Sequence, residues 1–219
     1  MKIALILPKS GFALLAVLLM GSFAGVTYSQ VQFPVELPTP KVGDVAKYRT
    51  IDLWTNKEQS TTQSELVEIK PDRLMSRVTS STASQVNTVS HNREWQPCRS
   101  MEGSEQIVCT GSLKFPMKLG NKYSYEKLPY SNGKGWYQAS CEVKAEESVM
   151  VPAGTFDTVR IECPGYWTNS GFGNGSMKEI VWYAPKISRY VKLESRNFDA
   201  SSKPVQMIQI ELVEFVAGR

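Results

Sequence analysis

The chain has 219 residues, of which 42% are hydrophobic and 21% are charged, and its 25 basic residues exceed its 21 acidic residues by four. This composition is that of an ordinary globular protein, and it excludes collagen, coiled coil and extensive disorder. Lys2 and Lys9 lie in a segment that we expect to be removed. The remaining excess is too small for the strongly basic surface of a nucleic-acid-binding protein.

Residues 1–29 have the pattern of a secretory signal peptide. The two lysines precede an uncharged, largely apolar run from Ser10 to Ala24, which ends in small residues. This run is shorter than the roughly 20 apolar residues that a membrane-spanning helix needs. We expect cleavage after Ser29, or alternatively after Ala24, and a location in the periplasm or outside the cell. An uncleaved signal anchor is the other alternative.

Residues 30–40 are predicted to form an extended, proline-rich lead-in, since three prolines fall between Phe33 and Pro40. Residues 41–219 show no further linker and are expected to form a single domain. The segment from Pro40 to Tyr48 resembles the one from Pro116 to Tyr123, because each has a Gly-Asp or Gly-Asn pair before an aromatic residue. The domain could therefore consist of two β units that divide near residue 114.

Apolar and polar residues alternate through most of this domain, as in Ile208-Gln-Ile-Glu-Leu212, and a period of two predicts β-strands. No segment has a helical apolar stripe over three turns. Strands with one apolar and one polar face indicate an all-β, antiparallel sheet, with little helix beyond the signal peptide. The expected strands are 45–54, 60–70, 73–80, 84–91, 122–127, 136–151, 155–163, 177–184, 189–196 and 206–216.

All four cysteines follow the signal segment, and an even number in an exported chain usually forms disulfides. If residues 136–163 form a hairpin about residue 152, Cys141 lies opposite Cys163 on one buried face. Apolar residues at positions 143, 145, 149, 151, 159 and 161 would share that face.

Cys98 and Cys109 flank a second candidate hairpin turn at residues 101–105. We therefore expect disulfides 98–109 and 141–163. A zinc site is the alternative use of four cysteines, but no C-x-x-C pair is present, so no metal site is expected.

Three motifs resemble those of a group of exported bacterial β-proteins of unknown function: V-P-A-G-T-F within 151–162, W-Y-A-P within 181–185 and V-K within 190–194. Residues 42–44 and 115–120 fit the same group. Its members are similar to the curved half-barrels of periplasmic lipoprotein carriers, which shelter acyl chains on the concave face. The resemblance implies a half-barrel or open barrel and a scaffold rather than a reaction. One departure is Ile187-Ser-Arg189, where the group often has glycine before the V-K strand.

No catalytic constellation is present, so we expect no enzyme activity and no cofactor. His91 is the single histidine, no serine lies in a G-x-S-x-G elbow, and we expect His91 to be a surface or turn residue. The glycine-rich run 171–175 neither follows a buried strand nor opens a helix, as a phosphate loop would.

Aromatic residues gather in the second half of the chain, and a loop expected at 165–172 combines three of them with small polar residues. Such loops suit contact with sugars, peptides or lipids, because aromatic rings provide contact area at low entropic cost. The alternative role for Trp136 and Trp182 is to fill the core. The candidate ligand-binding residues are Trp136, Tyr137, Tyr166, Trp167, Phe172 and Trp182.

The leading hypothesis is a non-catalytic, exported binding or carrier protein with an apolar or lipid-like ligand on the concave face of the sheet. The alternative is an interaction module that binds a cell-envelope protein or glycan through the aromatic loop 165–172. Neither hypothesis involves nucleic acid, and no stable transmembrane anchor is expected after signal cleavage.

Overall fold

The structure is a computed structural model, and it describes residues 31–100, 107–130 and 134–219. The expected signal peptide and the turn at 101–105 lie outside the described residues. Within them, twelve strands form one antiparallel sheet, and the short 3-10 helix η1 (Pro185–Ile187) is the only helix. The predicted all-β fold class is confirmed.

Ten strands correspond to the expected segments, although β9 ends later and β10 begins earlier than expected. Two further short strands, β5 and β6, each contain one cysteine of the first disulfide. The strands are β1 (Val45–Asp52), β2 (Lys57–Ile69), β3 (Arg73–Ser80), β4 (Ala83–Asn92), β5 (Pro97–Ser100), β6 (Ile107–Cys109), β7 (Lys122–Pro129), β8 (Gly135–Val151), β9 (Gly154–Asn169), β10 (Gly173–Ala184), β11 (Arg189–Asp199) and β12 (Pro204–Val216).

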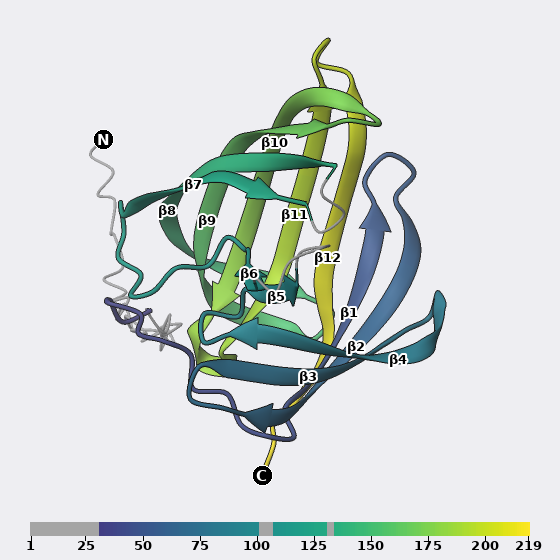
Figure 1. Cartoon of the computed structure of the whole chain (residues 1–219). Coiled ribbons are helices and arrows are strands. Elements are labelled where there is room, and N and C mark those ends of the chain that lie inside the picture. Colours follow the sequence, from purple (N-terminus) through teal and green to yellow (C-terminus); the bar gives the residue numbers. More distant parts are fainter. Residues whose placement is uncertain (1–30, 101–106, 131–133) are drawn as a thin grey trace, which may run out of the picture.

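The sheet is an open, curved half-barrel. Its strand order is β6-β5-β4-β3-β2-β1-β12-β11-β10-β9-β8-β7, so sequence neighbours pair with each other and β1 pairs with β12. Strands β6 and β7 are the two edges, and residues 110–121 join them. Figure 1 shows β7 to β12 as one curved wall, with β1 to β4 turning across from it and β5 and β6 between them.

The two similar sequence segments form similar turns at the start of each run of six strands. Gly43 donates its backbone N–H to Leu66 on β2 at 2.7 Å, and Gly120 donates to Val143 on β8 at 2.9 Å. Leu66 and Val143 each donate back to the residue that follows the glycine, at 2.9 and 3.0 Å. The two similar sequence segments therefore form the same hydrogen-bonded turn, once before β1 and once before β7.

Both disulfides join the expected cysteines, Cys98 to Cys109 and Cys141 to Cys163, so no cysteine is left for zinc. Cys98 lies opposite Cys109 in the β5–β6 pair. Next to the second disulfide, Val143 lies opposite Ile161, as the alternation predicts.

The prediction that one face holds all the apolar odd positions of β8 is wrong beyond Val143. A bulge follows Val143 and places Ala145 opposite Arg160, so the later apolar residues of β8 point to the other side of the sheet. A bulge adds one residue to one strand and reverses the side-chain alternation after it, which periodicity alone does not reveal.

The tip of the β8–β9 hairpin folds over the neighbouring strands. Val151 packs in a second apolar cluster with Trp182 on β10 and Leu212 on β12. The backbone N–H of Ala153 donates to the carbonyl of Leu212 at 3.2 Å. Among the apolar residues beyond the bulge, Val151 is therefore buried by this fold-back, and Val149 packs partly buried against the same cluster.

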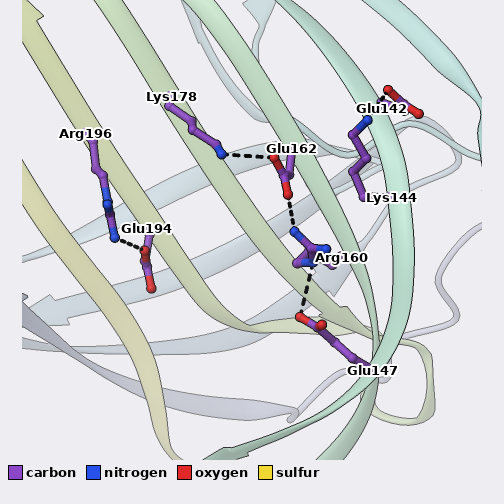
Figure 2. Close-up of polar contacts among 8 residues, drawn as sticks. All are labelled: Glu142, Lys144, Glu147, Arg160, Glu162, Lys178, Glu194 and Arg196. Carbon is purple, nitrogen blue, oxygen red and sulfur yellow. Dashed lines mark hydrogen bonds and ion pairs between the residues drawn. The ribbon is translucent and has the colours of Figure 1, made fainter.

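The outer face of the sheet carries ion pairs across and along the strands (Figure 2). Lys178 on β10 lies 3.0 Å from Glu162 on β9, which also pairs with Arg160. The Nε atom of Arg160 lies 3.3 Å from Glu147 on β8. The hydrogen bond from Lys178 outweighs desolvation and holds the pKa of Glu162 below its usual value. The outer face is therefore polar, whereas the inner face holds the main apolar core.

We predict that replacing both Cys141 and Cys163 by alanine lowers the free energy of unfolding. The cysteines are 22 residues apart, and on the chain-entropy model closing such a loop stabilises the fold by about 3 kcal/mol. Urea unfolding of the variant measures the loss, and reduction of the wild-type protein provides the control. A variant as stable as the oxidised wild type would contradict this prediction.

Candidate ligand-binding site

The centre of the inner face is covered by the chain itself. Leu113 and Met117, from the segment that joins β6 and β7, pack with Trp95 and Val35 against the inner side chains of the sheet. Val35 and Met117 exchange two backbone hydrogen bonds, at 2.9 and 2.8 Å. We call residues 31–39, 92–96 and 110–117 the covering segments. The concave face is therefore not an empty trough.

Side-chain hydrogen bonds join the covering segments to each other. The amide of Gln96 donates to the carbonyl of Leu113 at 2.7 Å. The backbone N–H of Phe115 donates to the carboxylate of Glu94 at 2.9 Å. These contacts hold the covering segments in place over the inner face, and the rest of that face stays uncovered.

Hollows remain on the inner face beside the covering segments, and two of them have Arg189 or Glu179 in their walls. The first, of about 170 Å³, is called the arginine pocket, and its walls include Tyr48, Thr62, Ser64, His91, Trp95 and Arg189. The second, of about 190 Å³, is called the tyrosine pocket, and its walls include Tyr125, Tyr130, Tyr137, Met177, Glu179 and Asn197. Both pockets combine aromatic surface with a charged side chain.

Arg189 is the unusual residue of the first pocket. Its side chain stacks on Trp95, with the guanidinium carbon 3.5 Å from the ring centroid, and the residue is only 6% exposed. Its Nε and Nη2 atoms are buried without a hydrogen-bond partner in the described part of the chain. Burial lowers the pKa of Arg189, and Tyr48 and Asp44 oppose that shift. A buried guanidinium without a close acid is costly for a protein.

His91 lies beside this arginine, and the expectation that it is a surface or turn residue is wrong. It pairs with the buried Leu74 on β3 and packs edge-on against Trp95, with the ring centroids 5.3 Å apart. Its Nδ1 atom is buried without a partner among the described residues. Burial, followed by the charge of Arg189, lowers the pKa of His91 to about 4. The imidazole is therefore neutral at neutral pH.

The tyrosine pocket holds a carboxyl group instead. The hydroxyl of Ser112 donates to Glu179, and burial raises the pKa of Glu179. Across the residues that the structure describes, no lysine, arginine or histidine forms an ion pair with it. Tyr130 and Tyr137 face each other with ring centroids 5.7 Å apart. The two pockets thus differ in the charge they offer to a ligand.

Of the candidate binding residues, the structure brings Tyr137 and Trp167 together. They are cross-strand partners of β8 and β9, and Tyr137 lines the tyrosine pocket. Trp167 is 9% exposed and donates its indole N–H to the carbonyl of Ser176 at 3.2 Å. Trp136 and Tyr166, their neighbours in sequence, point to the opposite face because side chains alternate along a strand.

The other two candidates are separated from the pockets. Trp182 is buried in the second apolar cluster, where its indole N–H donates to Glu147. Phe172 is 85% exposed at the turn between β9 and β10. The core role that was the alternative for Trp182 is therefore the observed one.

The expected loop at 165–172 is wrong for residues 165–169, because β9 continues to Asn169. One of its glycines, Gly165, lies in the sheet for a packing reason, as does Gly175 on β10. A Cβ atom on Gly165 would lie 2.1 Å from the carbonyl oxygen of Gln138, and one on Gly175 would lie 1.8 Å from that of Phe198. Glycine within a strand often marks such a close approach of backbones, whereas it predicts a loop from sequence alone.

The sequence reasoning did not identify Arg189 and Glu179. Each is charged but occupies an apolar position in the alternation of the sequence, Arg189 two residues before Val191 and Glu179 two residues before Val181. A charged residue in an apolar register is the signal that could have found both.

No protein-family model matches the chain, and no curated protein matches it. Among solved structures, a predicted exported protein from Bacteroides fragilis with a YmcC-like fold is similar, with a TM-score of 0.52 and 12% identity over 83% of this chain and 99% of that one. A predicted lipoprotein from Parabacteroides distasonis has a TM-score of 0.49 and 16% identity over 85% and 100% of the two chains. The first likeness shows a shared fold and supports, at that level, the resemblance to exported β-proteins.

Within residues 31–100, 107–130 and 134–219, no helix is long and apolar enough to cross a membrane. The same residues contain no group of three or more His, Cys, Asp or Glu side chains that could hold a metal ion.

We predict that His91 makes the protein less stable as the pH falls from about 6.5 to about 4. Over this range the unfolded chain, whose histidine has a pKa of 6.5, binds a proton that the folded chain does not. Stability is then lost by up to about 1.4 kcal/mol per pH unit. Because the chain has one histidine, the difference between wild type and His91→Asn isolates this effect.

Urea unfolding at pH 7.5, 6.5 and 5.5 measures both proteins. The loss of stability between pH 7.5 and 5.5 should be smaller in the variant. Equal slopes in the two proteins would show that His91 titrates normally.

Proposed function

We propose that this protein is a non-catalytic, exported binding or carrier protein whose ligand has an apolar, lipid-like portion that lies against the inner face. The observation that carries the proposal is the pair of hollows that remain on an apolar inner face, opposite a charged outer face. Burial of apolar ligand surface there would supply about 25 cal/mol per Å² before the costs of ordering.

A larger groove supports a ligand that extends beyond one pocket. This groove of about 460 Å³ runs along the proline-rich lead-in, with Val35, Leu37, Phe156, Tyr183 and Ile187 among its walls. Tyr183 also belongs to the inner core cluster, so the groove reaches the inner face. The backbone N–H of Thr39 donates to the Ser188 hydroxyl at 3.2 Å, next to Arg189.

Export is supported by two disulfides, which persist in oxidising compartments. It is also supported by the signal-like start of the sequence and by the fold shared with a protein that is predicted to be exported. The surroundings of His91 support a role without catalysis, because a general base needs an oriented imidazole within reach of a nucleophile. Its buried Nδ1 has no partner in the described chain to orient it.

We predict that the purified protein binds the uncharged apolar probe N-phenyl-1-naphthylamine and that Val78→Trp or Ser195→Trp weakens this binding. Val78 lines the arginine pocket and Ser195 the tyrosine pocket, so a larger side chain reduces the space for the probe. Titration calorimetry should give an affinity lower by about 10-fold for at least one variant, the cost of losing a few buried methylene groups.

Arg77→Trp is the matched control, since Arg77 precedes Val78 on β3 and is exposed in an ion pair with Glu65 at 3.4 Å. Its affinity should equal that of the wild type. Native mass spectrometry and lipid extraction of protein from the exporting cell test the natural ligand. Absence of bound lipid, together with unchanged probe affinity in both pocket variants, would reject the proposal.

The second candidate function, binding of a cell-envelope protein or glycan, is favoured by exposed aromatic residues. Tyr166 is 61% exposed, and it lines an outer-face groove of about 400 Å³ with Gln138 and Glu126. Phe172 is 85% exposed. An aromatic ring beside amide and carboxylate groups suits a sugar ring.

Under this alternative, Tyr166→Ser combined with Phe172→Ser should abolish sedimentation of the protein with envelope fragments. Binding of the naphthylamine probe should stay unchanged, because neither side chain lines an inner-face pocket. Unchanged sedimentation of the double variant would exclude these two residues as the binding surface.

A further inference from the structure

No acidic side chain of the described residues forms an ion pair with Arg189, although the residue is only 6% exposed. Asp44 is buried and acts on Arg189 electrostatically, but its two carboxylate oxygens accept the backbone N–H groups of Lys41 and Gly218, each at 2.8 Å. The guanidinium therefore retains unused hydrogen-bonding capacity next to a hollow.

The unpaired polar atoms around the pocket are mainly donors. Besides Nε and Nη2 of Arg189, the indole N–H of Trp95 is buried without a partner, as is Nδ1 of His91, within the part of the chain that the structure describes. The hydroxyls of Thr62 and Ser64 also line the pocket. Buried polar groups normally find partners, so a set of unpaired donors points to an acceptor-rich ligand.

The size and walls of the pocket limit that ligand. A hollow of about 170 Å³ accommodates a small group. The stacked rings of Tyr48 and Tyr190, with centroids 4.8 Å apart, and the side chain of Val78 provide apolar wall. The planar guanidinium matches the geometry of a carboxylate or phosphate, which can accept two parallel N–H bonds.

We propose that the arginine pocket binds an oxyanion, a carboxylate or a phosphate, with Arg189 as its counter-charge and Trp95 as a second donor. The proposal rests on the proposed function in one respect: it assigns the oxyanion to the head of the apolar ligand held on the inner face. The shared chemistry is the oxyanion itself, which an amphiphilic acid or a free anion can supply.

The test compares decanoate with decanol, which have the same apolar chain but differ in charge, as competitors of the naphthylamine probe. Decanoate should compete at about 10-fold lower concentration than decanol in the wild type, as expected for charge-assisted hydrogen bonds. In Arg189→Met the two should compete equally. Arg189→Lys, which keeps the charge but loses the fork, should show an intermediate preference.

Arg196→Met is the matched control, because Arg196 lies on the same strand and pairs with Glu194 on the outer face at 2.9 Å. It should retain the preference for decanoate. Circular dichroism and urea unfolding establish that each variant is folded. Because Arg189 has no ion pair to lose, Arg189→Met should be at least as stable as the wild type without ligand.

Acetate and inorganic phosphate form the second arm of the test. If either raises the thermal midpoint of the wild type but not of Arg189→Met, while decanoate and the probe do not bind, the anion site stands and the proposed apolar function fails. If decanoate and decanol compete equally in the wild type and neither small anion raises its midpoint, the oxyanion proposal is overturned and the proposed function stands.

Discussion

The constraint on which the rest of this structure depends is that an open, curved sheet with one apolar face has to cover that face. A closed barrel would bury it by bringing the edges together, but here β6 and β7 remain unpaired edges. The chain instead lays its own covering segments across the opening, and Val35 and Met117 hydrogen-bond to each other over the core. The positions of the two pockets follow from where these segments end. Both pockets lie in the part of the inner face that these segments leave uncovered.

The two faces of the sheet differ in the side chains that they carry. Alternation places Glu162 and Ile161 on opposite faces of β9, and the first joins the outer ion pairs whereas the second joins the inner core (Figure 2). Exposed ion pairs contribute little stability each, so the outer face mainly keeps this side of the sheet in water. The fold-back of the β8–β9 tip buries an apolar patch around Trp182 that the outer side would otherwise expose. On the inner face, the two pockets leave apolar side chains accessible beside the covering segments.

Features that depend on residues close together in the sequence could be predicted from it, whereas features that depend on contacts between distant segments could not. The strands and the opposition of Cys141 and Cys163 depend on alternation within a hairpin, which the sequence displays directly. The bulge after Val143 depends on how two strands pair, and the need for Gly165 and Gly175 depends on the approach of a neighbouring backbone. The covering of the inner face depends on residues that are still farther apart in the sequence, since it joins Val35 to Met117. The sequence does not display which part of the inner face stays open, so aromatic content alone predicts the six candidate binding residues. Among these six, Tyr137 lines an inner-face pocket.

Arg189 and Glu179, two charged residues of the inner face, can be compared with the residues that stability alone would favour. Arg189 and Glu179 lie in separate pockets and form no ion pair with each other or with another described residue. Replacing buried charged groups with well-packed apolar residues is often neutral or stabilising by about 1–4 kcal/mol, so packing provides no reason for either. Glu179 can reduce its cost by binding a proton, because burial raises its pKa. A guanidinium has no such escape, since it stays protonated in proteins. Its cost would be lowest with an anion against it, and this is the role that we propose for the hollow beside Arg189.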